Sequence, residues 1–187
     1  MKNIVIFASG SGSNAENIAT YFKDSKTVNV KAVFTNNANA GVIEKMKKFQ
    51  IPCIVFTKDD FKSKEYFLIR LYQYRPDLIV LAGFLWLVPN YLVHAYPNKM
   101  INIHPALLPK FGGKGMYGMH VHEAVKAANE SETGITIHYV NQKFDDGKII
   151  FKEKTQLTEN DTPESIAQKI HKLEMANFPV EIERILK

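Results

Sequence analysis

The sequence predicts an α/β domain with a doubly wound, mostly parallel sheet and helices on both of its faces. Three observations favour this fold class: an apolar run at residues 3–8, a glycine-rich turn that leads into a helical pattern, and further apolar runs separated by helical segments. Continuous apolar runs are typical of strands that are buried on both faces in a parallel sheet. Strands that alternate with helices are joined by right-handed crossovers, which place them in one sheet.

The first half of the chain alternates regularly between the two kinds of element. After the strand at 3–8, apolar residues at positions 15, 18, 19 and 22 have the spacing of a helix. Strand patterns then follow at 28–34, 51–56 and 78–82, and helical patterns lie between them at 40–49 and 59–74. A length of 187 residues suits a substantial core, and we expect a single domain over residues 1–187.

The second half begins with a short helix and ends with a longer one. Three further strand patterns lie between these helices, at 99–103, 134–140 and 148–153. The first of them stops before Pro105, which cannot continue a ladder of hydrogen bonds. The last helix begins at Asp161 or Thr162 as its cap, with Pro163 in its first turn, and reaches about residue 178. A kink is expected at Pro179.

The composition excludes several classes of protein. With 45% hydrophobic and 23% charged residues the chain is neither disordered nor fibrous. Its net charge of +5 favours anionic ligands, but the basic residues are scattered and indicate no nucleic-acid groove. Cys53 is the only cysteine, which leaves no internal disulfide and no cysteine-based zinc site. No apolar run reaches membrane-spanning length, so we expect a cytoplasmic protein with neither membrane nor nucleic-acid partners.

The glycine-rich turn after the first strand is a candidate phosphate site. The motif Gly10-x-Gly12-x-x-Ala15 would expose backbone N–H groups at the positive end of a helix, and Ser13 and Asn14 add polar donors. The motif also fits a dinucleotide fingerprint, but the second strand is followed by Asn36, where NAD requires an acidic residue. Asn14 could instead simply cap the helix. Lys64 could reach the phosphate or be a solvated surface lysine.

The strand at 99–103 delivers two polar side chains to its end. Asn102 and His104 are two residues apart, so both leave the same face of an extended strand. An amide and an imidazole placed there could polarise a carbonyl and stabilise an oxyanion. Asp145, on the loop between the last two strands, could pair with His104 and hold it protonated. The alternative is that Asn102 forms a turn and His104 is a structural histidine.

Other segments could complete a site. Residues 85–88 are apolar and follow a strand, as expected of core residues or of a slot for a flat heteroaromatic ring. The glycine-rich stretch at 111–118 could be a lid. The pair His120 and His122 lacks a third metal ligand, so we expect a helix start with one histidine directed to the site. The remaining histidines are expected to be structural: His94, His138 and His171.

An ordered set of motifs, taken together, resembles the phosphoribosylglycinamide formyltransferase family over essentially the whole chain. The motifs are Gly10 to Asn14, Leu81 to Phe84, Asn102 to Pro109, Gly134 to His138 and Asp145 to Gly147. The resemblance implies the formyltransferase fold, with a phosphate-binding N-terminal half and a C-terminal half that carries the folate site and the catalytic loop. It also implies a monomer or homodimer that uses 10-formyltetrahydrofolate and glycinamide ribonucleotide, without a metal.

The resemblance further implies a role for each site residue. The residues that would bind the ribonucleotide are Gly12, Ser13, Asn14, Lys64 and Glu174. The residues that would bind the formyl folate are Leu85, Trp86, Leu87, Val88, Asn102, Asn141 and Phe144. Asn102 and protonated His104 would stabilise the oxyanion formed when the amine attacks the formyl carbon. Asp145 would orient His104 and support proton transfer to the departing folate nitrogen.

Three features depart from the family pattern: Trp86 replaces a frequent basic residue, Asp146 replaces a frequent glycine, and the segment at 112–118 is long.

The rival interpretations share the catalytic core or the phosphate loop. One is a methionyl-tRNA or sugar-nucleotide formyltransferase, although the tRNA enzyme usually carries an added C-terminal domain, which this 187-residue chain does not show. Another is a non-catalytic nucleotide-binding α/β module.

Overall fold

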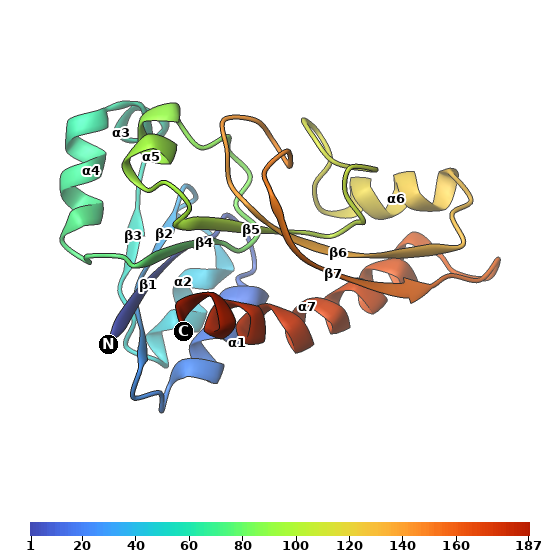
Figure 1. Ribbon diagram of the computed structural model, residues 1–187, viewed down its shortest axis with the longest axis horizontal. Helices are drawn as coiled ribbons and strands as arrows, with labels where there is room; N and C mark the ends of the chain where they lie inside the picture. Colours follow the sequence, from blue (N-terminus) through green and yellow to red (C-terminus); the bar gives the residue numbers. More distant parts are fainter.

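A seven-stranded sheet with the order β3-β2-β1-β4-β5-β6-β7 forms the centre of the computed structural model, which describes residues 1–187 (Figure 1). The strands are β1 (Lys2–Phe7), β2 (Val28–Thr35), β3 (Cys53–Val55), β4 (Leu78–Leu81), β5 (Met100–His104), β6 (Glu132–Tyr139) and β7 (Ile149–Gln156). The strands β1 to β5 are parallel to one another, whereas β6 pairs antiparallel with both β5 and β7. The mostly parallel sheet predicted from the apolar runs is confirmed.

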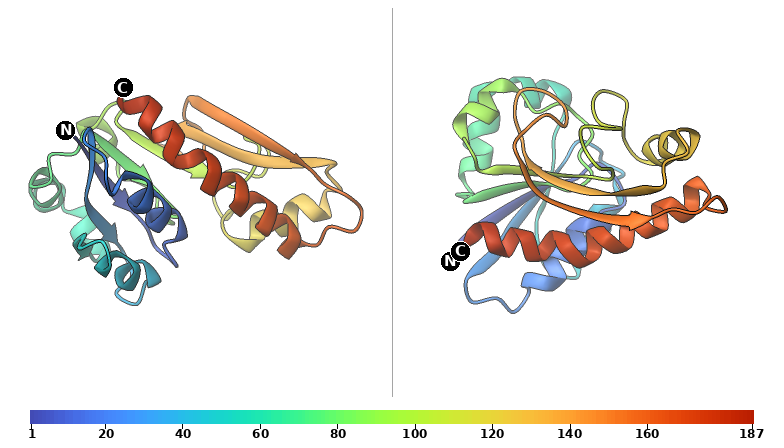
Figure 2. Two further views of the ribbon diagram at one scale, coloured as in Figure 1. Left: turned by 90° about the horizontal axis from the view of Figure 1, so that it is seen from below. Right: turned by 45° about the vertical axis from the view of Figure 1, so that its right-hand side comes forward.

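Helices cover both faces of this sheet (Figures 1 and 2). The helices that pack into the larger core are α1 (Ser13–Phe22), α2 (Gly41–Lys47), α6 (Met119–Ala127) and α7 (Pro163–Leu186). The helices that pack into the smaller core, on the other face, are α3 (Lys58–Lys62), α4 (Lys64–Tyr72) and α5 (Asn90–Ala95). None of these helices has the length and apolarity needed to cross a membrane.

Side chains alternate along β1 between the two cores. Ile4 and Ile6 contribute to the larger core, while Val5 and Phe7 contribute to the smaller one, and all four are fully buried. This alternation follows from the two-residue period of a strand, and it explains why a strand buried on both faces is apolar at every position. The strand therefore holds the turn at its carboxyl end in a fixed place between the two helical layers.

The predicted single helix at 59–74 is wrong, because Ser63 separates α3 from α4. Ser63 has an extended backbone with ψ 96°, and its N–H bonds to the carbonyls of Asp59 and Asp60. A capping box formed by Thr57 and Asp60 starts α3. Helix α3 is thus a separate short helix with its own cap, and α4 begins afresh at Lys64.

The kink expected at Pro179 is not a break, since α7 continues to Leu186 (Figure 2). Proline has no N–H, so the carbonyl of Met175, four residues earlier, loses its usual partner. In this fold the side chain of Asn17 in α1 donates to that carbonyl at 2.8 Å. A contact from a neighbouring helix therefore satisfies the group that would otherwise favour ending the helix.

Candidate active site

A cavity of about 630 Å³ opens at the carboxyl ends of the parallel strands. Its walls come from segments that follow β1, β4 and β5, from the loop between β6 and β7, and from α7. Open α/β sheets bind their ligands at this edge. Most of the site residues expected from the sequence line the cavity: Asn14, Leu85, Trp86, Leu87, Val88, Asn102, His104, Asn141, Phe144, Asp145 and Glu174.

Three expected residues, all assigned to the phosphate site, do not line the cavity. Gly12 and Ser13 lie at the start of α1, directly before Asn14, which does line it. Lys64 is exposed at the start of α4, and α4 packs on the opposite face of the sheet from α1. The structure does not bring Lys64 into the cavity wall, and its contact with a phosphate stays a prediction.

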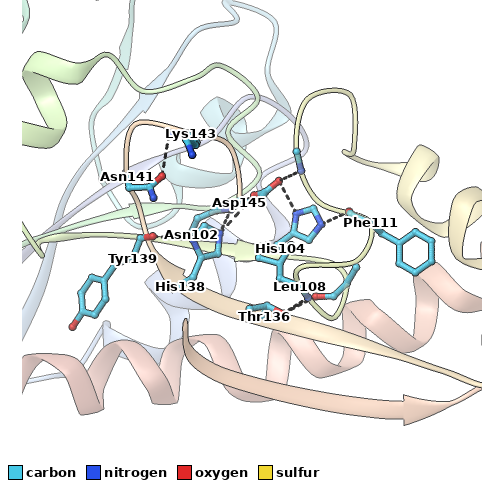
Figure 3. A network of polar contacts seen from close by, with 12 residues as sticks. Asn102, His104, Leu108, Phe111, Thr136, His138, Tyr139, Asn141, Lys143 and Asp145 are labelled. Carbon is cyan, nitrogen blue, oxygen red and sulfur yellow. Dashed lines mark hydrogen bonds and ion pairs between the residues drawn. The ribbon is translucent and has the colours of Figure 1, made fainter. Parts of the chain in front are cut away.

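Asn102 and His104 meet Asp145 at the end of β5, as the spacing of the strand predicts (Figure 3). Asn102 Nδ2 donates to Asp145 Oδ1 at 3.3 Å, and His104 Nδ1 lies 3.4 Å from Asp145 Oδ2. Asp145 has a left-handed backbone with φ 51°, which turns its carboxylate back from the loop toward the strand. The two side chains of His104 and Asp145 are 4% and 11% exposed, so this charge pair is shielded from water.

Both ring nitrogens of His104 face hydrogen-bond acceptors. Nδ1 faces the carboxylate of Asp145, and Nε2 lies 2.7 Å from the backbone carbonyl of Phe111. An imidazole satisfies two acceptors only when each nitrogen carries a hydrogen, which makes the ring positively charged. The geometry therefore supports the predicted protonated state of His104.

Asp145 stays ionised in this setting. Burial favours the neutral acid, but the hydrogen bond and the charge of His104, together with the N–H of Gly113, hold the pKa of Asp145 well below its ordinary value of 3.8. A carboxyl with a lowered folded-state pKa stabilises the fold above its unfolded pKa. This contribution is lost only as the pH falls from about 4 toward the lower folded-state pKa.

His138 belongs to the site, so the prediction of a purely structural role for it is wrong. It lines the cavity, and its Nδ1 lies 2.9 Å from the carbonyl of Tyr139, to which it donates. Its Nε2 is then free to accept from Asn102 Nδ2 at 3.1 Å, while Asp145 Oδ1 lies 3.6 Å away. Because Asp145 and His138 both accept from Asn102, they fix the orientation of the amide and occupy both of its N–H groups.

The start of the glycine-rich segment at 111–118 is fastened to this network. The carbonyl of Phe111 contacts His104, and the N–H of Gly113 donates to Asp145 Oδ2 at 3.0 Å. A Cβ on Gly112 would lie 2.5 Å from Leu108 Cδ2 and 3.2 Å from Asp145 Cβ, which explains the need for glycine. The segment predicted to be a lid is therefore bound to His104 and Asp145 through its backbone.

Asn14 lies inside α1 and does not cap it, contrary to the capping alternative. Gly12 is the N-cap, with φ 74°, and no side chain satisfies the first N–H groups of the helix. A Cβ on Gly12 would lie 2.5 Å from Val42, so only glycine fits at this close approach. Free N–H groups at a helix start attract anions, which agrees with the predicted phosphate site.

Asn14 instead donates through Nδ2 to Glu174 Oε2 on α7 at 3.1 Å. Glu174 also has His171 Nδ1 at 3.8 Å, and His171 lines the cavity, contrary to the structural role expected for it. Burial raises the pKa of Glu174 to about 7, although the hydrogen bond from Asn14 opposes the shift. Glu174 therefore changes its charge near neutral pH at the wall of the cavity.

The Glu174→Gln substitution is expected to stabilise the ligand-free protein above pH 7 and to have little effect on stability near pH 4.5. A carboxyl with a raised folded-state pKa favours folding below its unfolded pKa of 4.5, and this advantage is lost as the pH rises through about 7. The shift corresponds to ~3 kcal/mol as an order of magnitude. Urea unfolding at both pH values measures the difference. A variant less stable than wild type at pH 8 would contradict the conclusion that the buried, ionised carboxylate of Glu174 destabilises the fold.

The remaining aromatic and histidine residues either line the cavity or lie exposed outside it. Trp86 contacts Phe56 with ring centroids 5.9 Å apart, so it belongs to the aromatic core as well as to the slot. His122 lines the cavity while His120 is exposed, as expected for one histidine directed to the site. His94 is exposed and contacts Gln142. No group of three or more His, Cys, Asp or Glu side chains is arranged to hold a metal ion.

Comparison with known proteins adds a family match to this geometry. The model of the formyl transferase family matches residues 2–182. The phosphoribosylglycinamide formyltransferase of Bacillus subtilis is 38% identical and aligns with 100% of this chain and 95% of its own length. A chloroplastic enzyme of the same name from Arabidopsis thaliana is 40% identical over 92% of this chain, which spans 62% of that protein.

Solved structures are similar over the same extent. The crystal structure of phosphoribosylglycinamide formyltransferase from Bacillus halodurans has a TM-score of 0.87 and 37% identity, covering 100% of this chain and 96% of that chain. The enzyme of the same name from Streptococcus pneumoniae has a TM-score of 0.87 and 31% identity, with both chains covered completely.

Proposed function

The chain belongs to the formyl transferase family and transfers formyl groups in purine biosynthesis, and we propose that Asn102, His104 and Asp145 carry out the transfer. The formyl donor is 10-formyltetrahydrofolate and the acceptor is glycinamide ribonucleotide, as for the relatives. The observation that carries the proposed mechanism is the shielded contact of His104 with Asp145, whose side chains are 4% and 11% exposed. A charged imidazole held there suits the stabilisation of a developing oxyanion.

The acceptor amine attacks the formyl carbon, and the carbonyl electrons move to the formyl oxygen. His104 stabilises this oxyanion through Nε2, which must first exchange the carbonyl of Phe111 for the substrate. An oxyanion contact from Asn102 requires a similar exchange, because both of its N–H groups are engaged by His138 and Asp145. Closure on the substrate would thus replace contacts within the protein by contacts to the reacting group.

Asp145 keeps His104 charged and oriented while the tetrahedral intermediate collapses. The bond from carbon to the folate nitrogen then breaks, and that nitrogen takes up a proton, through water that Asp145 helps to hold. The proposal needs neither a metal nor a covalent intermediate. Asp145 suits this role because three groups of the site converge on its carboxylate: His104, Asn102 and Gly113.

The two substrates fit opposite parts of the cavity. The ribonucleotide phosphate would bind the free N–H groups at the start of α1, around Gly12 and Ser13, with Asn14 and Glu174 beside the rest of the molecule. The pterin would enter the slot between residues 85–88 and the loop that carries Asn141 and Phe144. This arrangement would place the formyl group beside Asn102 and His104, between the two substrates.

The acceptor is tested by following folate absorbance when purified protein is mixed with 10-formyltetrahydrofolate and one acceptor at a time. We expect turnover with glycinamide ribonucleotide and none with methionyl-tRNA or sugar nucleotides. Turnover with one of the other acceptors, and none with glycinamide ribonucleotide, would contradict the assignment.

The cytoplasmic location and the monomeric or homodimeric state stay predictions, which fractionation and sedimentation can check.

A further inference from the structure

Formyl transfer requires a proton acceptor, since the attacking nitrogen becomes positively charged when it bonds to the formyl carbon. The groups at the end of β5 are poorly suited to this task. His104 already donates from both nitrogens, and the carboxylate of Asp145 is engaged by three groups. The Nε2 of His138 accepts from Asn102. A further basic group that faces the cavity is therefore required.

His122 is the buried histidine of the cavity wall whose ring makes no hydrogen bond. It lies in α6, its residue is only 6% exposed, and its Nδ1 is buried without a partner. The side chain nevertheless lines the cavity, so the atom that can meet a ligand is Nε2. A buried histidine is normally held by hydrogen bonds from the protein, so a ring without them leaves its Nε2 available to a ligand in the cavity.

The surroundings of His122 keep the ring neutral. Burial, and after it the positive charge of His104, lower the pKa of His122 below its ordinary value of 6.5. Other titratable groups face the same cavity from the elements around it: Lys114, His138, Asp145, His171 and Glu174. At neutral pH His122 is thus an uncharged base in the wall of the same cavity as the charged acid His104, an arrangement that suits proton transfer between two substrates.

We infer that His122 Nε2 accepts the proton from the attacking amine of the ribonucleotide. The bond from nitrogen to the formyl carbon forms, and the carbonyl electron pair moves to oxygen. The N–H electron pair stays on nitrogen while the proton moves to His122. The electron pair on oxygen then re-forms the carbonyl as the bond from carbon to the folate nitrogen breaks. The electrons of that bond stay on the folate nitrogen, which gains the proton from His122 through water. Protons and electrons balance, and His122 returns to its neutral state.

The substitution His122→Gln tests this role, since glutamine keeps a hydrogen-bonding group near Nε2 but cannot carry the proton. We expect kcat to fall by about 10²-fold or more, with KM for both substrates within about threefold of wild type. The matched control is His120→Gln in the same helix turn, where the side chain is 64% exposed, and its kcat should stay within about twofold. A kcat within threefold of wild type for His122→Gln, or a rise confined to KM, would overturn the inference.

Two further measurements separate proton transfer from a structural role. In His122→Ala, added imidazoles should restore kcat at least tenfold, and more strongly as their base strength rises. Rescue that ignores base strength would contradict the proton transfer. In the wild type, ¹⁵N NMR should find the His122 ring neutral at pH 7, and a charged ring would also overturn the inference, even if neither variant folds.

This inference rests on the proposed function, and the two can fail separately. Absence of transfer to glycinamide ribonucleotide by the folded wild type would refute the proposed function. An active wild type with a fully active His122→Gln variant would refute only the role of His122.

Discussion

The substitution His104→Ala is expected to lower kcat for formyl transfer by about 10³-fold. Both ring nitrogens of His104 face acceptors, so its removal takes away the positive charge that is proposed to stabilise the formyl oxygen. Substrate binding should change much less, because this charge is needed most when the oxyanion forms. Steady-state kinetics with both substrates measures the two effects separately, through kcat and KM.

The matched control for this variant is His120→Ala, which removes an exposed imidazole that the cavity does not include. It should retain wild-type kinetics. His104→Ala also leaves the carboxylate of Asp145 buried without its charged partner, and a lower melting temperature is expected. Normal turnover by a well-folded His104→Ala protein would refute the oxyanion role.

The substitution Asp145→Asn is expected to reduce kcat almost as strongly, by about 10³-fold. Asparagine accepts a left-handed backbone, so the loop at φ 51° should keep its shape. The amide is neutral, however, and cannot pair with the positive charge of His104. It must also turn its NH2 group toward one of the groups that donate hydrogen bonds to the carboxylate in the wild type. The imidazole of His104 then has no carboxylate to stabilise its charge, so the oxyanion loses its charged partner.

The adjacent residue offers a control for Asp145→Asn. Asp146 is half exposed and contacts Lys143 and Asn141, away from the network around His104, so Asp146→Asn should leave kcat within about twofold. Stability provides an independent measurement. Asp145→Asn should destabilise the fold above pH 4, and the difference should shrink as the pH falls, because the wild-type carboxylate is then protonated as well. Equal stability at pH 7 would contradict the buried ion pair.

The order of the strands and helices could be predicted from the sequence because apolar runs and glycine-rich turns are local signals. The break at Ser63 could not, since the apolar pattern of 59–74 runs across it and only the backbone conformation separates the two helices. The continuation of α7 through Pro179 could not be predicted either. It depends on Asn17, which is more than 150 residues away in the chain.

The site was partly predictable for a similar reason. Asn102 and His104 share a face because they are two residues apart, and Asp145 lies on the loop that returns to them. His138 gave no local signal, since a histidine in an apolar strand is usually structural. Its place becomes evident only from the antiparallel register, in which His138 lies directly opposite Asn102. The position of Glu174 likewise depends on how α7 crosses α1, which no local pattern states.

The contact between the backbone carbonyl of Phe111 and His104 affects how fast the formyl donor is lost to hydrolysis. While that contact lasts, the ring has no N–H available to activate a formyl group, so a bound formyl folate is not made more reactive toward water. The formyl group can be activated only after the glycine-rich segment at 111–118 moves away from His104. Hydrolysis of the donor, which would waste its carbon, should therefore be slow in the absence of the acceptor.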